Sequence, residues 1–142
     1  MKKLHYEIKI NAEPEKVWTT LWEDMHYRQW SSAFCKGSFY QGTLDEGSTV
    51  RFFDPENNGM FSRVIKNVPN REMVFLHQGE IHDGIEIPQD WENATESYIL
   101  EETDNETVLK VVVNSSEEFE NFFEEAFPRA LQNVKNLAEN QL

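Results

Sequence analysis

The sequence predicts an α+β domain in which a curved antiparallel sheet of about seven strands wraps around a long carboxy-terminal helix. Three observations support this class. The chain opens with a strand pattern that changes into a short helix, its middle alternates strand-like runs with turn segments, and its end carries an apolar stripe at helical spacing. Since the apolar face of a sheet and the apolar stripe of a helix must each be covered, packing the helix on the sheet is the economical arrangement.

The first strand and helix are read from the stretch "KKLHYEIKINAEPEKVWTTLW". Apolar residues alternate with polar ones from Leu4 to Ile10, the period that places one face of a strand on a core. Pro14 suits the first turn of a helix, where its missing N–H has no cost. Four apolar side chains then share one helical face: Val17, Trp18, Leu21 and Trp22. A second short helical or irregular piece is expected around residues 25–30.

The middle of the chain has the punctuation of antiparallel strands. Turn segments such as "LDEGS", "DPENNG", "VPNRE" and "ETDNET" separate runs rich in Val, Ile, Phe and Tyr. We expect strands near residues 34–41, 48–54, 59–68, 72–81, 94–102 and 107–114. Within the fourth of these the following side chains share the face expected to point inward: Met73, Phe75, His77, Gly79 and Ile81.

The last segment predicts an amphipathic helix from about residue 115. Ser115 and Glu118 have the spacing of a capping box at its start. Pro128 falls inside the apolar stripe, where it should kink the helix or begin a second helical segment. The stripe consists of Phe119, Phe122, Phe123, Ala126, Phe127, Ala130, Leu131, Val134 and Leu137.

Composition limits the classes of function. A length of 142 residues fits a single domain, 1–142, and ten Phe and four Trp exclude a disordered chain. The net charge of −13 disfavours nucleic acid as a partner, and no run approaches the roughly 20 apolar residues that span a bilayer, so we expect no membrane insertion. Cys35 is the only cysteine and the amino terminus lacks an apolar leader, which together favour a cytoplasmic protein.

The order of these elements and several of their segments resemble the START-like, or SRPBCC, superfamily. The segments that carry the resemblance are "INAEPEKVWTTLWE", "GSTVRFFDP", "VPNREMVFLH", "ESYILEETDNETVLKVVV" and "AFPRALQNVKNLAE". Within that superfamily they are most similar to the branch named for the carboxy-terminal domain of the Aha-type activator of the heat-shock chaperone ATPase. The resemblance covers essentially the whole chain and implies the helix-grip fold. It also implies a largely apolar cavity between sheet and long helix, which in relatives holds small hydrophobic molecules.

If such a cavity is present, its expected ligand contacts are Met73, Phe75, His77, Trp91, Tyr98, Phe123, Phe127 and Arg63. His77 would orient a ligand or carry a proton, although the favoured interpretation is a core histidine satisfied by Tyr98 or a backbone carbonyl. Glu96 would be a general acid only if it pointed inward. Arg51 and Arg63 could meet an anionic ligand, but ion pairing at the surface is the simpler account. The long connection around Trp91 is a candidate lid, or packed surface.

Three functions follow from the resemblance. The leading hypothesis is non-catalytic binding of a small hydrophobic or amphipathic molecule, with no cofactor and no metal, since His77, His82 and Asp83 match no standard ligand spacing. The alternative is a cyclase, aromatase or hydrolase, which requires at least two of His77, Glu96 and Tyr98 to converge in one cavity. A co-chaperone that stimulates the chaperone ATPase is the least favoured partner-binding role. The oligomeric state is left open.

Overall fold

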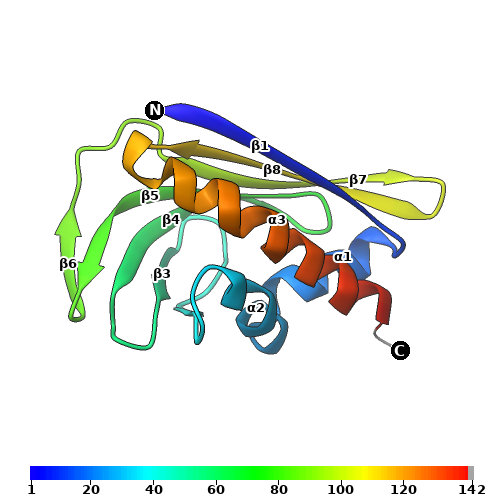
Figure 1. Ribbon diagram of the computed structural model, residues 1–142, viewed down its shortest axis with the longest axis horizontal. Helices are drawn as coiled ribbons and strands as arrows, with labels where there is room; N and C mark the ends of the chain where they lie inside the picture. Colours follow the sequence, from blue (N-terminus) through cyan, green and yellow to red (C-terminus); the bar gives the residue numbers. More distant parts are fainter. Residues whose placement is uncertain (141–142) are drawn as a thin grey trace.

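The computed structural model describes residues 1–140 and contains one eight-stranded antiparallel sheet with helices on one side (Figure 1). The sheet is not closed into a barrel, and its long helix α3 lies across it, so the predicted α+β helix-grip class is confirmed. The elements in chain order are β1 Lys2–Ile10, α1 Pro14–Trp22, α2 Asp24–Trp30, the 3-10 turn η1 Ser31–Ala33, β2 Phe39–Gln41, β3 Thr49–Phe53, β4 Gly59–Val68, β5 Glu72–His82, β6 Ile85–Pro88, β7 Thr95–Thr103, β8 Glu106–Ser115 and α3 Glu117–Asn140.

The strands follow the order β1-β8-β7-β5-β4-β3-β2, which places the amino-terminal strand beside the last one. Strand β5 is shared along its length: residues 72–76 pair with β7, and residues 79–82 pair with β6. Strand β4 has register shifts at Phe61/Ser62 and at Val64/Lys66 where it pairs with β5. Since such irregularities bend a strand and increase its twist, they help the sheet to curve around the helices.

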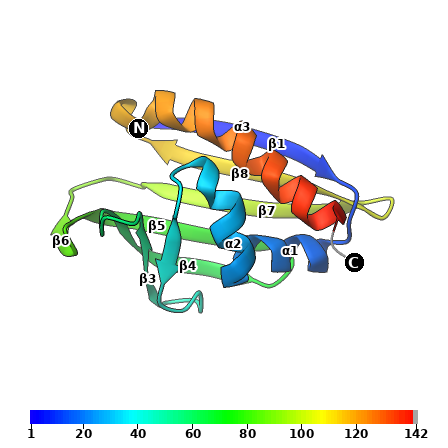
Figure 2. The ribbon, with the colours of Figure 1, turned by 60° about the horizontal axis from the view of Figure 1, so that its bottom comes forward.

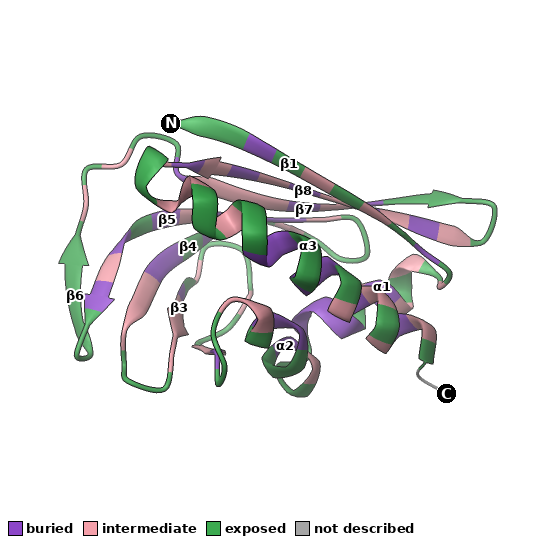
Figure 3. Cartoon of the chain, viewed as in Figure 1, coloured by how far each residue is buried: buried purple, intermediate pink, exposed green. Residues whose placement is uncertain are grey.

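The helices cover the inner face of the sheet (Figure 2). Buried positions concentrate where the sheet and the helices meet (Figure 3). The inward set expected for β5, from Met73 to Ile81 at every second position, is buried as predicted. In α3 the buried side chains all lie from Ala126 onward: Ala126, Phe127, Ala130, Leu131, Val134 and Ala138. Residues 117–125 therefore contribute little to the packed core.

The turns confirm the turn chemistry expected from the sequence. The hairpin between β7 and β8 turns on Asp104 and Asn105, both with positive φ, and Asn57 and Asn70 adopt the same left-handed region in two other turns. Asn and Asp tolerate this backbone region better than other non-glycine residues because their side chains can bond locally. Short-range chemistry is thus sufficient to place these reversals of the chain.

Four details differ from the expectations. The strand expected at 34–41 is confined to β2, because residues 34–37 form a turn after η1 that includes Gly37, with φ of 86°. The connection after β5 forms the additional strand β6. Ser115 ends β8 and donates its hydroxyl to the Ser116 carbonyl instead of capping α3. Helix α3 runs through Pro128 as one element, so no second helical segment begins there.

Candidate functional site

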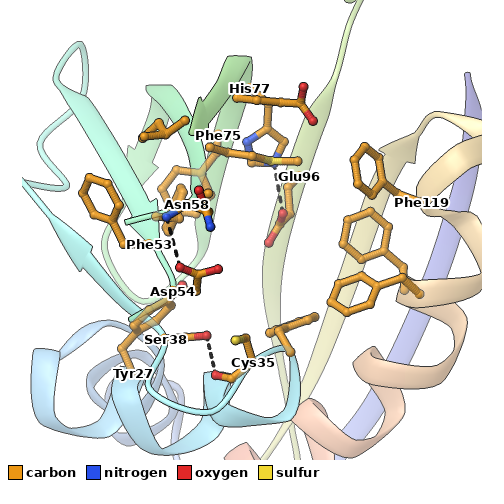
Figure 4. Close-up of a pocket in the computed structure, with 18 of the residues that line it drawn as sticks. Tyr27, Cys35, Ser38, Phe53, Asp54, Asn58, Phe75, His77, Glu96 and Phe119 are labelled. Carbon is orange, nitrogen blue, oxygen red and sulfur yellow. Dashed lines mark hydrogen bonds and ion pairs between the residues drawn. The ribbon is translucent and has the colours of Figure 1, made fainter. Parts of the chain in front are cut away.

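A cavity of about 420 Å³ lies between the inner face of the sheet, the α2 and η1 region and the first half of α3 (Figure 4). Its volume is within the range of small-molecule sites. The helices contribute aromatic rings from Trp22, Tyr27, Trp30, Phe119, Phe122 and Phe123. The sheet contributes Phe52, Phe75 and Tyr98, among others. The cavity exists where α3 buries no side chain, since the large residues of its first half stand beside the space and do not fill it.

Aromatic rings of the sheet pack against Trp22 of α1 and form a mutually braced wall. Trp22 meets Tyr98 edge to face with ring centroids 4.9 Å apart, and meets Phe75 in the same way at 5.5 Å. Phe75 in turn contacts Phe52 at 5.2 Å. The indole N–H of Trp30 donates to the Leu21 carbonyl at 2.9 Å, which ties α2 to α1. Because edge-to-face pairs have a preferred geometry, this wall is preorganised.

One chain of hydrogen bonds crosses this apolar wall. The Ser62 hydroxyl lies 2.6 Å from Nδ1 of His77, and Nε2 of His77 lies 3.0 Å from Oε1 of Glu96. The Tyr98 hydroxyl donates to the other oxygen of Glu96. Ser62 is fully buried, His77 is 8% exposed, and the Glu96 side chain is 17% exposed. An imidazole that accepts at Nδ1 and donates from Nε2 satisfies every polar group along this chain.

Glu96 is the most exposed member of this chain, and it lines the cavity. Burial together with its negative charge raises the pKa of two neighbouring phenols, those of Tyr98 and Tyr27. Burial raises the pKa of Tyr98 well above its usual value, and the negative charge of Glu96 raises it further. Burial also raises the pKa of Tyr27, with the charge of Glu96 as the next cause. The phenols therefore stay protonated, and Tyr98 remains a hydrogen-bond donor to the carboxylate.

The structure distributes the eight expected ligand contacts unevenly. Phe75, His77, Tyr98 and Phe123 line the cavity. Met73 and Phe127 lie within the hydrophobic core. Trp91 borders a separate small pocket of about 20 Å³, and Arg63 is exposed and lines no part of the cavity.

Two further expectations concern polar residues. His77 is satisfied, as favoured from the sequence, but its partners are Ser62 and Glu96 and not Tyr98 or a backbone carbonyl. Arg51 pairs with Glu86 at 2.7 Å, in agreement with the simpler account of ion pairing at the surface.

Within residues 1–140 no group of three His, Cys, Asp or Glu side chains could hold a metal ion. Likewise, no helix in this range is both long and apolar enough to cross a membrane.

Several residues of the site escaped sequence reasoning. Ser62 was missed because strand alternation is interrupted at the register shift between Phe61 and Ser62, and both residues are buried. Trp22 lies on the apolar face of a predicted helix, and Phe52 lies in a predicted strand. Neither pattern distinguishes a cavity wall from a solid core. Cys35, a residue type that is usually buried, is exposed and borders the cavity.

Comparisons with known proteins agree with this architecture. The family described as Activator of Hsp90 ATPase homolog 1-like protein (AHSA1) matches residues 11–139. The solution structure of the Aha1 dimer from Colwellia psychrerythraea is 23% identical with a TM-score of 0.77, and the match covers 99% of this chain and 98% of that chain. Protein MLL2253 from Mesorhizobium loti is 13% identical with a TM-score of 0.79, covering 99% and 100% of the two chains.

A third similar structure is CalU16 from Micromonospora echinospora, at 15% identity and a TM-score of 0.67, with 97% of this chain and 76% of that chain covered. At these identities the likeness shows a shared fold and no shared ligand. No curated protein matches the chain.

Proposed function

The chain belongs to the family of Activator of Hsp90 ATPase homolog 1-like proteins, and we propose that it binds a small hydrophobic or amphipathic molecule in its cavity without transforming it. The observation that supports this proposal is the persistence of an open space among so many large side chains. Ten Phe and four Trp could have filled the interior completely. Instead, aromatic rings from the sheet and the helices surround about 420 Å³.

Burial of an apolar ligand in this space provides the driving force. Each square ångström of apolar surface removed from water contributes about 25 cal/mol, so a ligand with about 200 Å² of apolar surface gains roughly 5 kcal/mol before the entropic cost of association. The braced wall lowers the cost of ordering side chains, because Trp22, Phe75 and Tyr98 already hold each other in place. The polar chain ending at Glu96 would orient the ligand through one polar group.

We propose binding without catalysis because the side chains of the hydrogen-bonded chain in the cavity wall already have partners within the protein. His77 has a partner at each ring nitrogen, and each oxygen of Glu96 accepts a hydrogen bond. A general base needs a free acceptor within reach of the substrate. In this chain both ring nitrogens of His77 are engaged, so the imidazole has no free acceptor, and the remaining acceptor capacity of Glu96 is assigned to orienting the ligand.

An acid-base enzyme of the cyclase or hydrolase type is the second candidate, favoured by one observation. His77, Glu96 and Tyr98 converge on the same cavity, which is the condition that the catalytic hypothesis required. A ligand that displaced His77 from Glu96 would free one carboxylate oxygen as a base. This candidate predicts turnover of the bound molecule, whereas the binding function predicts its recovery unchanged.

Native mass spectrometry of freshly purified protein, followed by denaturing extraction, tests the proposal. A co-purifying hydrophobic molecule is expected, and Cys35→Trp should reduce its occupancy because the indole would occupy part of the cavity. Lys36→Trp is the matched control, since Lys36 is the exposed neighbour and lines no part of the cavity. Equal occupancy in both variants would contradict binding in this cavity. A mass without ligand would favour a protein partner, to be sought by pull-down with the chaperone.

A further inference from the structure

The charged residues on the cavity wall are of one sign. The ionisable side chains that line it, other than tyrosines and the thiol of Cys35, are Asp54, Glu80, Glu96, His77 and His82, and within residues 1–140 no lysine or arginine lines it. A wall that recognised a carboxylate, sulfate or phosphate would need a cation or an array of donors directed at it. Here an anion would face carboxylates in a space of low polarity, an arrangement that is strongly unfavourable.

The carboxylates of the wall are held by uncharged groups or by imidazoles. Glu96 accepts from His77 and Tyr98, and Asp54 accepts from the backbone N–H groups of Glu56 and Asn58 at 2.8 and 3.0 Å. Glu80 accepts from the Gln89 amide at 3.1 Å, with an imidazole nitrogen 3.6 Å away. Other carboxylates pair with the following cations: Lys2, Arg28, Arg51, Lys66, Lys110 and Lys135. These interactions orient the three acids without bringing a lysine or arginine to neutralise them.

Aromatic faces add to the same preference. The electron-rich faces of Trp, Tyr and Phe attract cations, with Trp the strongest, and the attraction grows when the cation is desolvated. Trp22 and Trp30 both line the cavity. Glu96 lines the same cavity (Figure 4). The net charge of −13 also raises the local concentration of cations around the whole molecule. The wall therefore combines a carboxylate, aromatic rings and a favourable long-range field.

We propose that the cavity selects amphipathic cations, namely molecules with an aromatic or aliphatic body and one protonated amine or quaternary ammonium, with Glu96 as the counter-ion. This inference rests on the proposed binding function and specifies its ligand class. The apolar body occupies the space among the rings, and the ammonium group lies against the exposed part of the Glu96 carboxylate. The hydrogen bonds from His77 and Tyr98 hold that carboxylate in place, so the site is preorganised for a positive group.

Three probes of nearly equal shape test this inference by isothermal titration calorimetry: 1-naphthylmethylamine, 1-naphthalenemethanol and 1-naphthoic acid. At about pH 8 the amine is protonated and the acid is ionised. We expect the amine to bind at least about tenfold more tightly than the alcohol, and the acid to bind more weakly than both. Because the three probes differ in one substituent, the ranking isolates the contribution of charge.

Two variants locate the effect. Glu96→Gln should bring the affinity for the amine to within about threefold of that for the alcohol measured with the same variant. Glu92→Gln removes the same charge from an exposed position off the cavity and should change neither affinity. The ranking of the probes with the unmodified protein needs no variant, so the inference stays testable even if Glu96→Gln fails to fold.

The outcomes separate the inference from the function beneath it. Binding of the alcohol with no advantage for the amine, or with an advantage for the acid, overturns the cation preference and leaves hydrophobic binding intact. An advantage for the amine that Glu92→Gln abolishes as strongly as Glu96→Gln assigns it to net charge and also overturns the inference. If none of the three probes binds, the proposed binding function fails, and the inference fails with it.

Discussion

Replacing His77 with leucine tests whether the imidazole is a structural member of the polar chain. Leucine has a similar volume, so the change mainly removes two hydrogen bonds. The fully buried Ser62 hydroxyl then loses its partner, which costs about 1–3 kcal/mol of unfolding free energy. Glu96 loses less, because it is partly exposed and still accepts from Tyr98. The midpoint of thermal unfolding, Tm, should fall by roughly 4–12 °C for a chain of this length.

The double variant with Ser62→Ala separates this cause from packing. Ser62→Ala alone should also cost about 1–3 kcal/mol, since it leaves Nδ1 of His77 without a partner. When both partners are replaced, no buried group between them remains unsatisfied, so the double variant should be more stable than the sum of the single effects by about 1 kcal/mol or more. Denaturant unfolding of the four proteins measures this coupling. A coupling near zero, or a His77→Leu protein as stable as the unmodified one, would refute a structural role for His77.

Three further predictions concern other parts of the molecule. Gly59→Ala should destabilise the fold by about 2–3 kcal/mol, because the new Cβ would lie 1.7 Å from the Phe52 carbonyl oxygen. Gly47→Ala is the control: its Cβ would meet no atom within 4 Å, so it should cost only about 1 kcal/mol for the left-handed backbone. Equal losses of unfolding free energy in denaturant melts would argue against the steric cause. Pro128→Ala should restore a backbone N–H within α3. Because the preceding turns are then better hydrogen-bonded, amide hydrogen exchange over residues 117–127 should slow. Unchanged exchange would mean that the proline does not weaken this part of the helix. Burial raises the pKa of all four tyrosines, that of Tyr6 to about 12. Above about pH 10 the unfolded chain therefore releases phenol protons that the folded chain retains, and the free energy of unfolding should fall as pH rises. A tyrosinate absorbance titration of the folded protein with its midpoint near the ordinary value would contradict this.

The path of the chain was largely predictable because it depends on local chemistry. Alternation along β5 identified the buried face, and Asn and Asp at the turns identified the reversals. The errors lie where local signals compete. Residues 34–38 were expected to begin a strand, but they form the turn that follows η1 and includes Gly37. Ser115 ends β8 and does not begin α3. At Ser115, pairing with Lys2 of the distant strand β1 outweighs the local preference for a helix cap.

The candidate site was predictable only in part. Phe75, His77, Tyr98 and Phe123 follow from the inward faces of their elements and do line the cavity. Arg63 does not, because its strand position faces solvent, and Phe127 lies one turn too far along α3, within the core. No pattern of spacing distinguishes an aromatic side chain that fills a core from one that stands beside an open space.

What the sequence determined by itself is the order of the elements, the faces they bury and the reversals between them, since these follow from periodicity and turn chemistry over a few residues. The tertiary structure decided that α3 leaves a space beside its first half, that Ser62 meets His77 across a register shift, and that no lysine or arginine of residues 1–140 lines that space. These features depend on distances between residues far apart in the chain. A cavity is a property of the gaps between elements, which the periodicity of any single element does not contain.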